Sequence, residues 1–589
     1  MLGLHDRVER ILPLVQNPAQ YVGGEWNVRR KEITPDTLRI VFAFPDTYAI
    51  GMSHVGLQIL YHVLNDLEGV SCERAFMPWS DMEHQLRTND IPLFSLETFT
   101  PLSEFDVVAF SLQYELTCTN VLAMLDLGGV PVLAAERTPD DPWVIAGGPG
   151  ALNPEPLADF IDLFVVGDGE ETAPLLARTL HERKDSGPFS RREVLLELAR
   201  ASASFYVPTL YDVPGDGGAL RPTDTGVPFP ITAAAVNDLD AAPFPTRPIV
   251  PNTEVVHDRI AIEIMRGCPH HCRFCQAGRA RRPLRLRSVE KIVQLARDAY
   301  GSTGCDELAL TSLSSNDYPH LDRLLAKLDA QFRPLGVSLS VPSLRLSENL
   351  MRLPELLGRV RKSGLTYAPE AASTDLAEII GKHVVIDDLL AGVREAYAAG
   401  WDLVKLYYMV GLPGETDADV DAIVRLTRTV SDLRREFARG PAKVNVTVAP
   451  FIPKPHTPLQ WEPMAPVAYL EGVREKLKKA WRRGRIRLKF HDIRRSLLEA
   501  AFSRGDRRLG KVLLEAYRRG ARLDAWDEHF RADVWDDAFK ACDIDPLDYS
   551  HRRRAEEEVL PWSHIDVGLP PDDLLTQKRH VEKLIGERS

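Results

Sequence analysis

Three cysteines in one short segment could hold a metal centre. Cys268, Cys272 and Cys275 lie within eight consecutive residues, just after an apolar stretch of strand length, so one loop could turn all three sulfurs inward. A structural zinc site closes with four ligands, and here the fourth would be His270, His271 or a distant residue. Three thiolates with an open fourth position suit instead a four-iron cluster that keeps one iron free for a substrate or cofactor. The remaining cysteines have no comparable spacing: Cys72, Cys118, Cys305 and Cys542.

The cysteine segment follows the first strand of a β/α series. Apolar runs of strand length alternate with helical patterns, at residues 260–267, 307–313, 338–345, 365–371, 403–413 and 444–452. Successive strand–helix units of this kind build a barrel whose chemistry lies at the carboxyl ends of the strands. We therefore expect a partial (β/α)6 barrel with the cysteines at its catalytic end.

A separate group of strands precedes the barrel. The runs at 38–45, 106–112, 130–136, 143–149 and 163–169 are apolar throughout rather than alternating. This pattern indicates strands that are buried on both faces, hence a parallel sheet covered by helices. Such a doubly wound α/β domain binds its ligands at the carboxyl ends of its strands.

These patterns divide the chain into several parts, as its 589 residues require. After about residue 465 the strand pattern fades and helical periodicity dominates. The predicted parts are an N-terminal helix and connector (1–34), the doubly wound domain (35–185), a connecting region (186–255), the partial barrel (256–465) and a mainly helical, initially basic C-terminal region (466–589).

The charge distribution indicates a polyanionic partner. The net charge is −12, yet residues 470–522 contain 18 Lys and Arg against 6 Asp and Glu. A basic stretch inside an acidic protein suggests such a partner, and it allows RNA, a ribosomal component or an acidic small molecule. The alternative is a set of charged helix faces that are simply solvated.

The sequence also limits the cellular setting that we expect. No apolar run reaches the length of a membrane span, and charges interrupt the first residues where a signal peptide would be apolar. Seven scattered cysteines do not form a disulfide framework. We expect a cytoplasmic protein without a membrane partner.

The cysteine motif resembles that of the radical S-adenosylmethionine (SAM) superfamily. The spacing C-x-x-x-C-x-x-C, with Phe274 before the last cysteine and a β/α barrel strand before the first, carries the resemblance. It implies a [4Fe-4S] cluster whose open iron binds the amino and carboxylate groups of SAM. It also implies reductive cleavage of SAM to methionine and a 5′-deoxyadenosyl radical that abstracts hydrogen from a substrate. The expected electron donor is a flavodoxin or ferredoxin.

The same resemblance implies SAM contacts at the later strand ends. Where the family often has Gly-Gly-Glu, this chain has Thr311-Ser-Leu-Ser-Ser-Asn316, so serine hydroxyls would substitute. The Gly411-Leu-Pro-Gly414 turn resembles the family's adenine-contacting segment, and the proline-rich segment 449–461 would cover the barrel mouth. The expected SAM-binding residues are Phe274, Ser312, Ser314, Arg345, Glu370, Gly411, Pro413 and Gly414.

The first domain resembles the Rossmann-like, cobalamin-binding domains that precede this barrel in one subgroup of the superfamily. Gly- and Ser-bearing turns at 45–56, 110–115, 146–150 and 166–171 carry the resemblance, although the Asp-x-His-x-x-Gly run of cobalamin mutases is absent. The domain would bind cobalamin without a protein histidine ligand, or would have lost the function. The candidate cobalamin-binding residues are His54, Gly56, Ser111, Gln113, Gly147, Gly148, Gly167 and Glu170.

Three functions are compatible with these features. The first is a radical SAM enzyme that uses cobalamin to methylate an unactivated carbon, or hydrogen abstraction alone if the domain is a relic. The second is a methylthiotransferase that modifies RNA or protein, which usually needs three more cysteines where Cys72 and Cys118 supply two. The third is a non-enzymatic, zinc-stabilised protein that binds nucleic acid.

Overall fold

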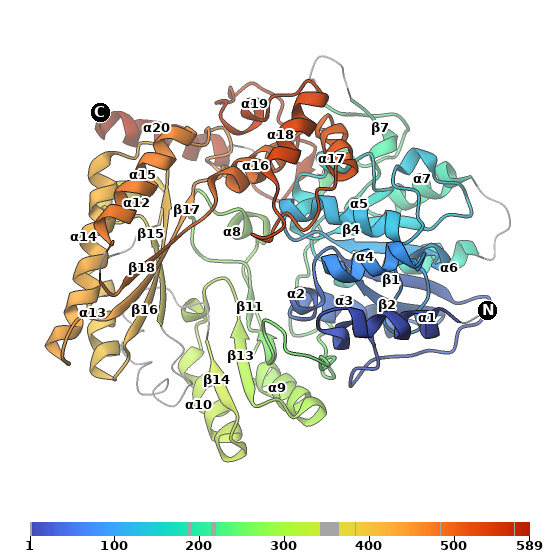
Figure 1. The fold of residues 1–589 in the computed structure, drawn as a ribbon, viewed down its shortest axis with the longest axis horizontal. Coiled ribbons are helices and arrows are strands. Elements are labelled where there is room, and N and C mark those ends of the chain that lie inside the picture. Colours follow the sequence, from blue (N-terminus) through green and yellow to red (C-terminus); the bar gives the residue numbers. More distant parts are fainter. Residues whose placement is uncertain are drawn as a thin grey trace.

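The computed structural model describes residues 3–184, 190–213, 219–341, 365–382, 385–482, 484–570 and 572–588. Its first domain is a six-stranded sheet in the order β2-β1-β3-β4-β5-β6, parallel except for β6 (Figure 1). The strands are β1 (Leu38–Phe44), β2 (Val70–Phe76), β3 (Val107–Ser111), β4 (Trp143–Gly147), β5 (Leu163–Val165) and β6 (Phe205–Tyr206). The helices are α1 (Leu4–Ile11), α2 (Tyr48–Met52), α3 (Val55–Asn65), α4 (Ser80–Thr88), α5 (Cys118–Leu127), α6 (Gly169–Lys184) and α7 (Arg191–Ala201).

The continuous apolar strands do form a covered parallel sheet, as expected. Strand β1 is buried at six of its seven residues, and α3 and α6 pack together against the sheet. The order of the first five strands is that of doubly wound domains whose ligand crevice lies between the first and third strands in sequence. Helix α7 and strand β6, which lie in the predicted connecting region, extend this sheet.

One predicted strand in this domain is wrong, and one strand was missed. Residues 130–136, which follow α5, form no strand and end in a short 3-10 turn. Strand β2 was not predicted, since its sequence VSCERAF carries Glu73 and Arg74, which read as exposed residues. Both are buried in the structure.

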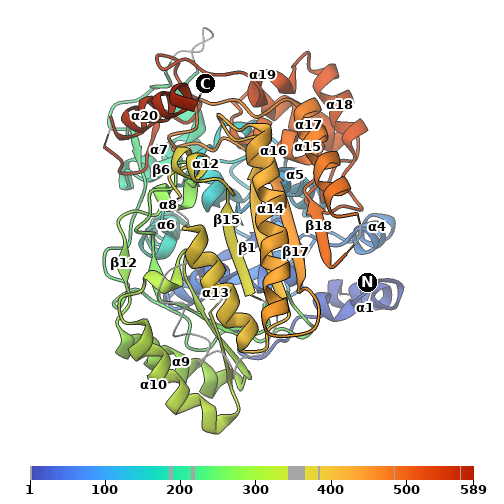
Figure 2. The ribbon, with the colours of Figure 1, turned by 90° about the vertical axis from the view of Figure 1, so that its left-hand side faces the viewer.

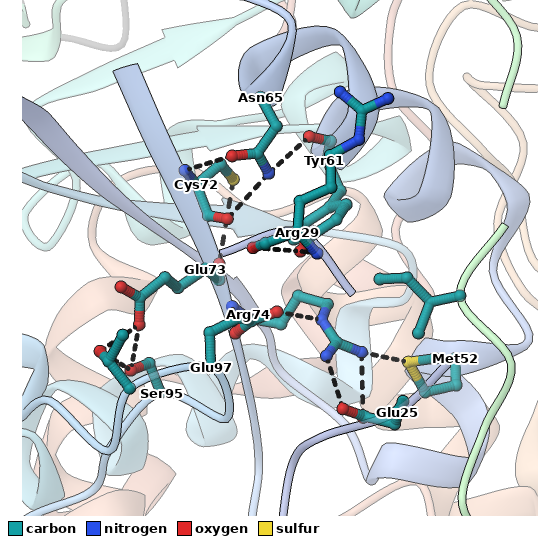
Figure 3. A network of polar contacts seen from close by, with 12 residues as sticks. Glu25, Arg29, Met52, Tyr61, Asn65, Cys72, Glu73, Arg74, Ser95 and Glu97 are labelled. Atoms are coloured by element: carbon teal, nitrogen blue, oxygen red, sulfur yellow. Dashed lines mark hydrogen bonds and ion pairs between the residues drawn. The ribbon is translucent and has the colours of Figure 1, made fainter. Parts of the chain in front are cut away.

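The buried charges of β2 are satisfied by a network of polar contacts (Figure 3). The Arg74 side chain, which is fully buried, forms ion pairs with Glu97 at 2.6 Å and with Glu25 at 3.0 Å. Asn65 accepts a hydrogen bond from the backbone amide of Cys72 at 3.1 Å. The network therefore ties the segment before β1 and the loop after α4 to the outer strand of the sheet.

The barrel strands lie in two sheets. Strands β10 (Ile260–Glu263), β13 (Glu307–Thr311) and β14 (Ser338–Ser340) form one, and β15 (Leu365–Glu370), β16 (Leu403–Val410), β17 (Lys443–Pro450) and β18 (Ile486–Phe490) form the other. All neighbouring strands are parallel, and within the described residues no ladder joins β14 to β15. The six predicted barrel strands are thus confirmed.

Helices cover the outer faces of both sheets (Figure 2). Helices α9 (Val289–Thr303) and α10 (Leu321–Phe332) pack on the first sheet. Helices α13 (Ile386–Ala398), α14 (Asp417–Leu433) and α15 (Val467–Ala480) pack on the second, against buried valines and leucines of alternate strand positions. A shorter helix, α12 (Thr374–Ile379), follows β15.

The C-terminal region is helical, with one correction. Its helices are α16 (Ile493–Ser503), α17 (Leu509–Arg518), α18 (Ala532–Ala541), α19 (Pro546–Ser550) and α20 (Asp573–Arg588), but the segment expected to be a basic helix contains β18. The sequence IRLKF alternates apolar and basic residues, which is the pattern of a strand with one solvated face. A short strand, β19 (Ile565–Asp566), pairs with β9 (Ile231–Thr232) of the connecting region.

The C-terminal region also covers part of the first domain. Helix α17 packs on α5, and the Trp526 indole donates a hydrogen bond of 3.0 Å to Asp46, at the end of β1. None of the helices in the described residues has both the length and the apolar character to cross a membrane.

Candidate active site

The three cysteines lie in a loop that is closed by a small antiparallel ladder. Strands β11 (Met265–Arg266) and β12 (Arg285–Leu286) pair at its base, and α8 (Gln276–Ala280) completes the excursion. Gly267 starts the loop with φ of +91°, and an added Cβ would lie 2.7 Å from the carbonyl oxygen of Arg281. Only glycine fits this turn without displacing backbone.

Cys275 begins α8 and binds its first turn. The sulfur accepts a hydrogen bond of 3.3 Å from the Gly278 amide. Burial raises the pKa of the Cys275 thiol, the Gly278 amide lowers it, and the nearby sulfurs of Cys272 and Cys268 raise it. The three thiols are therefore near enough to interact, at the end of the first barrel strand as predicted.

The spacing of the three cysteine sulfurs bears on the kind of centre that they could hold. Among the described residues, the one trio of His, Cys, Asp or Glu ligand atoms within 4.8 Å of one another is His5, Asp6 and Glu9, exposed on α1. At least one pair of the three cysteine sulfurs is therefore more than 4.8 Å apart. A tetrahedral zinc with bonds of about 2.3 Å would hold its sulfurs about 3.8 Å apart, whereas an iron–sulfur cubane binds each thiolate through a different iron.

Arg273 anchors the middle of the cysteine loop to the end of α12. Its backbone amide donates to the carbonyl of Ile380 at 2.8 Å, and its guanidinium donates to the carbonyl of Ile379 at 2.9 Å. These carbonyls at a helix end have no partner within the helix, so the arginine both satisfies them and fixes the loop. The sequence contained no signal for this contact, because it joins residues about a hundred positions apart.

The end of β13 meets the loop through a histidine. His270 contacts the Asp317 carboxylate at 2.7 Å, and the Ser314 hydroxyl donates to the same carboxylate. The hydroxyls of Ser312 and Ser315 are 2.9 Å apart. The serines predicted to contact SAM therefore lie beside the cysteine loop, where their hydroxyls also have protein partners.

Lys382 lies between Phe274 and Glu370. Its ammonium is 3.0 Å from a Glu370 carboxylate oxygen and 6.0 Å from the centre of the Phe274 ring, and it lowers the pKa of Cys275. Phe274 belongs to the same apolar cluster as Met409 of β16. The structure thus brings two predicted residues, Phe274 and Glu370, together with a lysine that has no motif and that the sequence analysis missed.

The Gly411–Gly414 turn packs against protein. Gly411 has φ of +76°, and its added Cβ would lie 2.7 Å from Cβ of Ala465; at Gly414, with φ of +75°, it would lie 2.9 Å from Ile585 of α20. The glycines thus permit the turn and its packing, and the faces expected to be open to adenine are covered by protein. Pro413 lies between them, and Arg345 lies outside the described residues.

A buried carboxyl closes the same turn. Glu415 accepts hydrogen bonds from the Gly411 amide at 2.8 Å and the Tyr469 hydroxyl at 2.7 Å. Burial raises the pKa of Glu415 to about 7.

Two of the candidate cobalamin turns flank the crevice between β1 and β3. His54 begins α3, where its Nδ1 accepts a hydrogen bond of 3.1 Å from the Leu57 amide, and an added Cβ at Gly56 would lie 2.8 Å from the imidazole. Burial, and secondarily Arg281, lower the pKa of His54 to about 4. Beyond β3, the Gln113 amide donates to the Ser111 hydroxyl at 2.7 Å.

The remaining candidate cobalamin residues do not form an open cradle. An added Cβ would lie 2.8 Å from the Leu112 oxygen at Gly148 and 2.2 Å from the Ala234 oxygen at Gly167. At Gly147 the nearest oxygen, of Val165, would be 3.4 Å away, and Glu170 is ion-paired with Arg266 at 2.6 Å. These turns do not fit a corrin resting directly on bare backbone, because their own chain occupies the space.

An ion-pair cluster joins the cysteine loop to the first domain. Arg266, the residue before Gly267, reaches Asp168 at 3.2 Å and Glu170 at 2.6 Å, after β5. Arg285, its partner in the ladder, reaches Asp168 at 2.7 Å. The base of the loop is therefore held at the carboxyl end of the first sheet.

Comparison with known proteins identifies two matching families. Residues 262–427 match the model of the radical SAM superfamily, and residues 56–208 match that of the N-terminal domain of radical SAM proteins. Uncharacterized protein MJ0966 of Methanocaldococcus jannaschii is 28% identical over 454 residues, which cover 76% of this chain and 88% of that protein. The threonylcarbamoyladenosine tRNA methylthiotransferase MtaB of Thermotoga maritima is 25% identical over 286 residues, covering 46% of this chain and 59% of that protein.

Solved structures with related folds were also found. The radical SAM methyltransferase TsrM of Kitasatospora setae, with cobalamin and a [4Fe-4S] cluster bound, has a TM-score of 0.49 and 15% identity over 94% of this chain and 99% of that one. The cobalamin-dependent enzyme OxsB has a TM-score of 0.46 and 11% identity over 98% and 85%. The two family matches together cover more than half of the residues, and the chain belongs to the radical SAM superfamily, as an enzyme that cleaves SAM reductively with the [4Fe-4S] cluster that this family implies.

Proposed function

We propose that Cys268, Cys272 and Cys275 hold the [4Fe-4S] cluster and that this chain initiates radical chemistry on a substrate inside the barrel. The observation that carries the proposal is the placement of the three cysteines in one closed loop at the carboxyl end of the first barrel strand. When bound, the cluster supplies the electron that cleaves SAM to methionine and the 5′-deoxyadenosyl radical.

The chain's own residues would shape the surroundings of the cluster. Arg273 fixes the loop that carries the thiolates, and the apolar cluster on which Phe274 and Met409 both pack would exclude water on one side. Lys382, held by Glu370, places a positive charge beside Cys275. A flavodoxin or ferredoxin remains our proposed electron donor.

Metal analysis tests the assignment. The protein would be purified and reconstituted without oxygen, and iron, sulfide and zinc measured per chain. We expect about four irons and four sulfides per chain in the native protein, and their loss in the Cys268→Ala/Cys272→Ala/Cys275→Ala variant. Stoichiometric zinc, or iron and sulfide retained by the triple variant, would overturn the assignment.

A second proposal is that the first domain binds cobalamin for methyl transfer to an unactivated carbon. The order of its strands supports a ligand at the crevice between β1 and β3, which His54 and Gln113 flank. The filled turns at Gly148 and Gly167 count against a corrin lying on those turns, so only the β1–β3 edge is proposed to contact it. Titration with hydroxocobalamin, followed by absorbance, should reveal a spectral change that His54→Ala weakens; no change in the native protein would reject cobalamin use.

The methylthiotransferase alternative is less well supported. One relative is a tRNA methylthiotransferase, but a second cluster would need thiolates from the first domain. Cys72 is completely buried within β2, where burial raises the pKa of its thiol well above the ordinary range. Such a thiol resists the deprotonation that cluster ligation requires.

A further inference from the structure

The inner face of the second barrel sheet is polar and cationic. Strands β16, β17 and β18 bury one set of alternate residues against α13, α14 and α15. The other set points away from these helices, toward the inside of the barrel, and includes Lys405, Lys443, Arg487 and Lys489 but no Asp or Glu. We call these four residues the inner cation row.

The register places these cations on one continuous surface. Lys405 pairs with Asn445, which pairs with Arg487; the next inward-facing set is Tyr407, Thr447 and Lys489. Residues in register on neighbouring parallel strands share a face, and the strands lie about 4.8 Å apart. The row therefore crosses the sheet from β16 to its edge at β18, which Figure 2 shows beyond β17.

No counter-ion of the inner cation row is found among the residues that the structure describes. Within the described part of the chain, none of its four side chains takes part in a hydrogen bond or ion pair. Other basic residues of the 470–522 stretch are paired: Lys476 with Asp421, Arg494 with Asp536, Arg507 with Glu155 and Arg519 with Glu515. Within the described residues, several other cations of this stretch are thus ion-paired, whereas Arg487 and Lys489 of β18 are not.

The row leads to the cysteine loop. Met409 follows Tyr407 on the inner face of β16 and packs in the same apolar cluster as Phe274, the neighbour of Cys275. At about 3.3 Å per strand residue, Tyr407 is about 7 Å and Lys405 about 13 Å from Met409 along the strand. A ligand held on the row would therefore bring its far end to the site of chemistry.

The neighbours of the row indicate the kind of ligand. Tyr407 is 37% exposed among the cations and offers an aromatic face. Thr366, Asn445 and Thr447 add neutral hydrogen-bonding groups on the same face. Cations that follow phosphates, an aromatic ring that stacks a base and neutral groups that reach a 2′-hydroxyl are the combination that binds single-stranded RNA.

We infer that the inner cation row, with Tyr407, binds a single-stranded segment of RNA as the substrate of this enzyme. The inference rests on the proposed function only for the chemistry, because binding itself needs no cluster. Lys405, Lys443, Arg487 and Lys489 hold successive phosphates, and the nucleotide beyond Tyr407 lies next to Phe274.

Fluorescence anisotropy of a labelled 15-nucleotide RNA tests the inference on the full chain, reconstituted without oxygen. We expect Arg487→Ala/Lys489→Ala to weaken binding at least tenfold at low salt and to reduce the slope of log K against log[salt] by about 1.4, as for two lost contacts to a single strand. Among the single variants, Lys489→Ala should reduce this salt slope, whereas Lys489→Arg, which keeps the charge, should leave it at the native value. The matched control, Arg494→Ala/Arg519→Ala, removes the same charge from paired positions and should leave affinity within twofold.

Several results would overturn the inference. These are no RNA binding by the native chain, equal loss in the control double variant, equal affinity for DNA of the same sequence, and complete competition by polyglutamate at matched charge. The triple cysteine variant separates the two proposals, since RNA affinity is expected to persist there. If RNA affinity persists in the triple variant but the native enzyme does not cleave SAM, the proposed function is rejected and the RNA site is retained.

Discussion

Arg266 and Arg285 stand opposite each other in the ladder that closes the cysteine loop, and both side chains reach Asp168 of the first domain. One carboxylate thus serves two guanidinium groups that are each about 95% buried. The position of the loop relative to the first sheet depends on this contact. If the two domains separated there, the Asp168 carboxylate and the two guanidinium groups would lose one another as partners.

Replacing Asp168 should therefore destabilise the fold. Asp168→Asn leaves two buried guanidinium groups with less compensation, and we expect a loss of about 3 kcal/mol in the free energy of unfolding. Urea denaturation followed by circular dichroism measures it. As a control, Asp224→Asn removes the partner of Arg192 at an exposed pair and should cost less than about 1 kcal/mol. Equal losses of unfolding free energy in the two variants would contradict the role of Asp168 in holding the loop to the first domain.

The loop start should not tolerate a side chain. Gly267→Ala adds a Cβ that would lie 2.7 Å from the Arg281 oxygen at φ of +91°, so we expect strain of about 1–3 kcal/mol and impaired cluster incorporation. Iron content after reconstitution measures the second effect. Gly301→Ala, in α9 with open space around it, should be neutral or stabilise by about 0.5 kcal/mol. Full iron loading of Gly267→Ala would show that the turn can relax.

Lys382 should tune the cluster electrostatically. A positive charge beside Cys275 favours the reduced, more negative cluster, so Lys382→Met should lower the reduction potential on the order of tens of millivolts. An EPR-monitored redox titration reports the shift. Lys382→Arg keeps the charge and should stay near the native potential. An unchanged potential in Lys382→Met would show that the lysine does not tune the cluster.

Glu415 should give stability a defined pH dependence. Its pKa rises to about 7 in the folded chain from an ordinary value of 4.5 because it is buried. Between these two pH values the folded state therefore binds more protons than the unfolded state. The stabilising contribution is complete below about pH 4.5 and is lost as pH rises to about 7. Relative to the native chain, Glu415→Gln should gain on the order of 2 kcal/mol between pH 5 and 8. Glu471→Gln, at an exposed position on α15, should show the same pH dependence of stability as the native protein. The prediction is contradicted if Glu415→Gln shows the native pH dependence too.

The sequence predicted best where function and local pattern coincide. The cysteine spacing after a strand located the loop, and six barrel strands followed from apolar runs. It failed where tertiary contacts decide the structure. Strand β2 was missed because it contains the charged residue Arg74, which is buried, and β18 was missed because basic residues occupy its alternate positions.

The contacts that complete the candidate site lie beyond any local pattern. Arg273, Lys382 and Asp168 each act through a partner that is distant in sequence or outside any motif. The glycines expected to face ligands illustrate the opposite error, because Gly167 and Gly411 are required by packing of the chain on itself. A glycine at a strand end indicates close approach, but the approaching group can be protein.

The central claim is that these three thiols support reductive cleavage of SAM. The most direct measurement is the yield of 5′-deoxyadenosine, by liquid chromatography and mass spectrometry, after anaerobic incubation with SAM and dithionite. The native chain and the Arg494→Ala/Arg519→Ala control should both form 5′-deoxyadenosine and methionine in equal amounts, and the triple cysteine variant should form neither. Equal yields from the native chain and the triple variant would contradict the account.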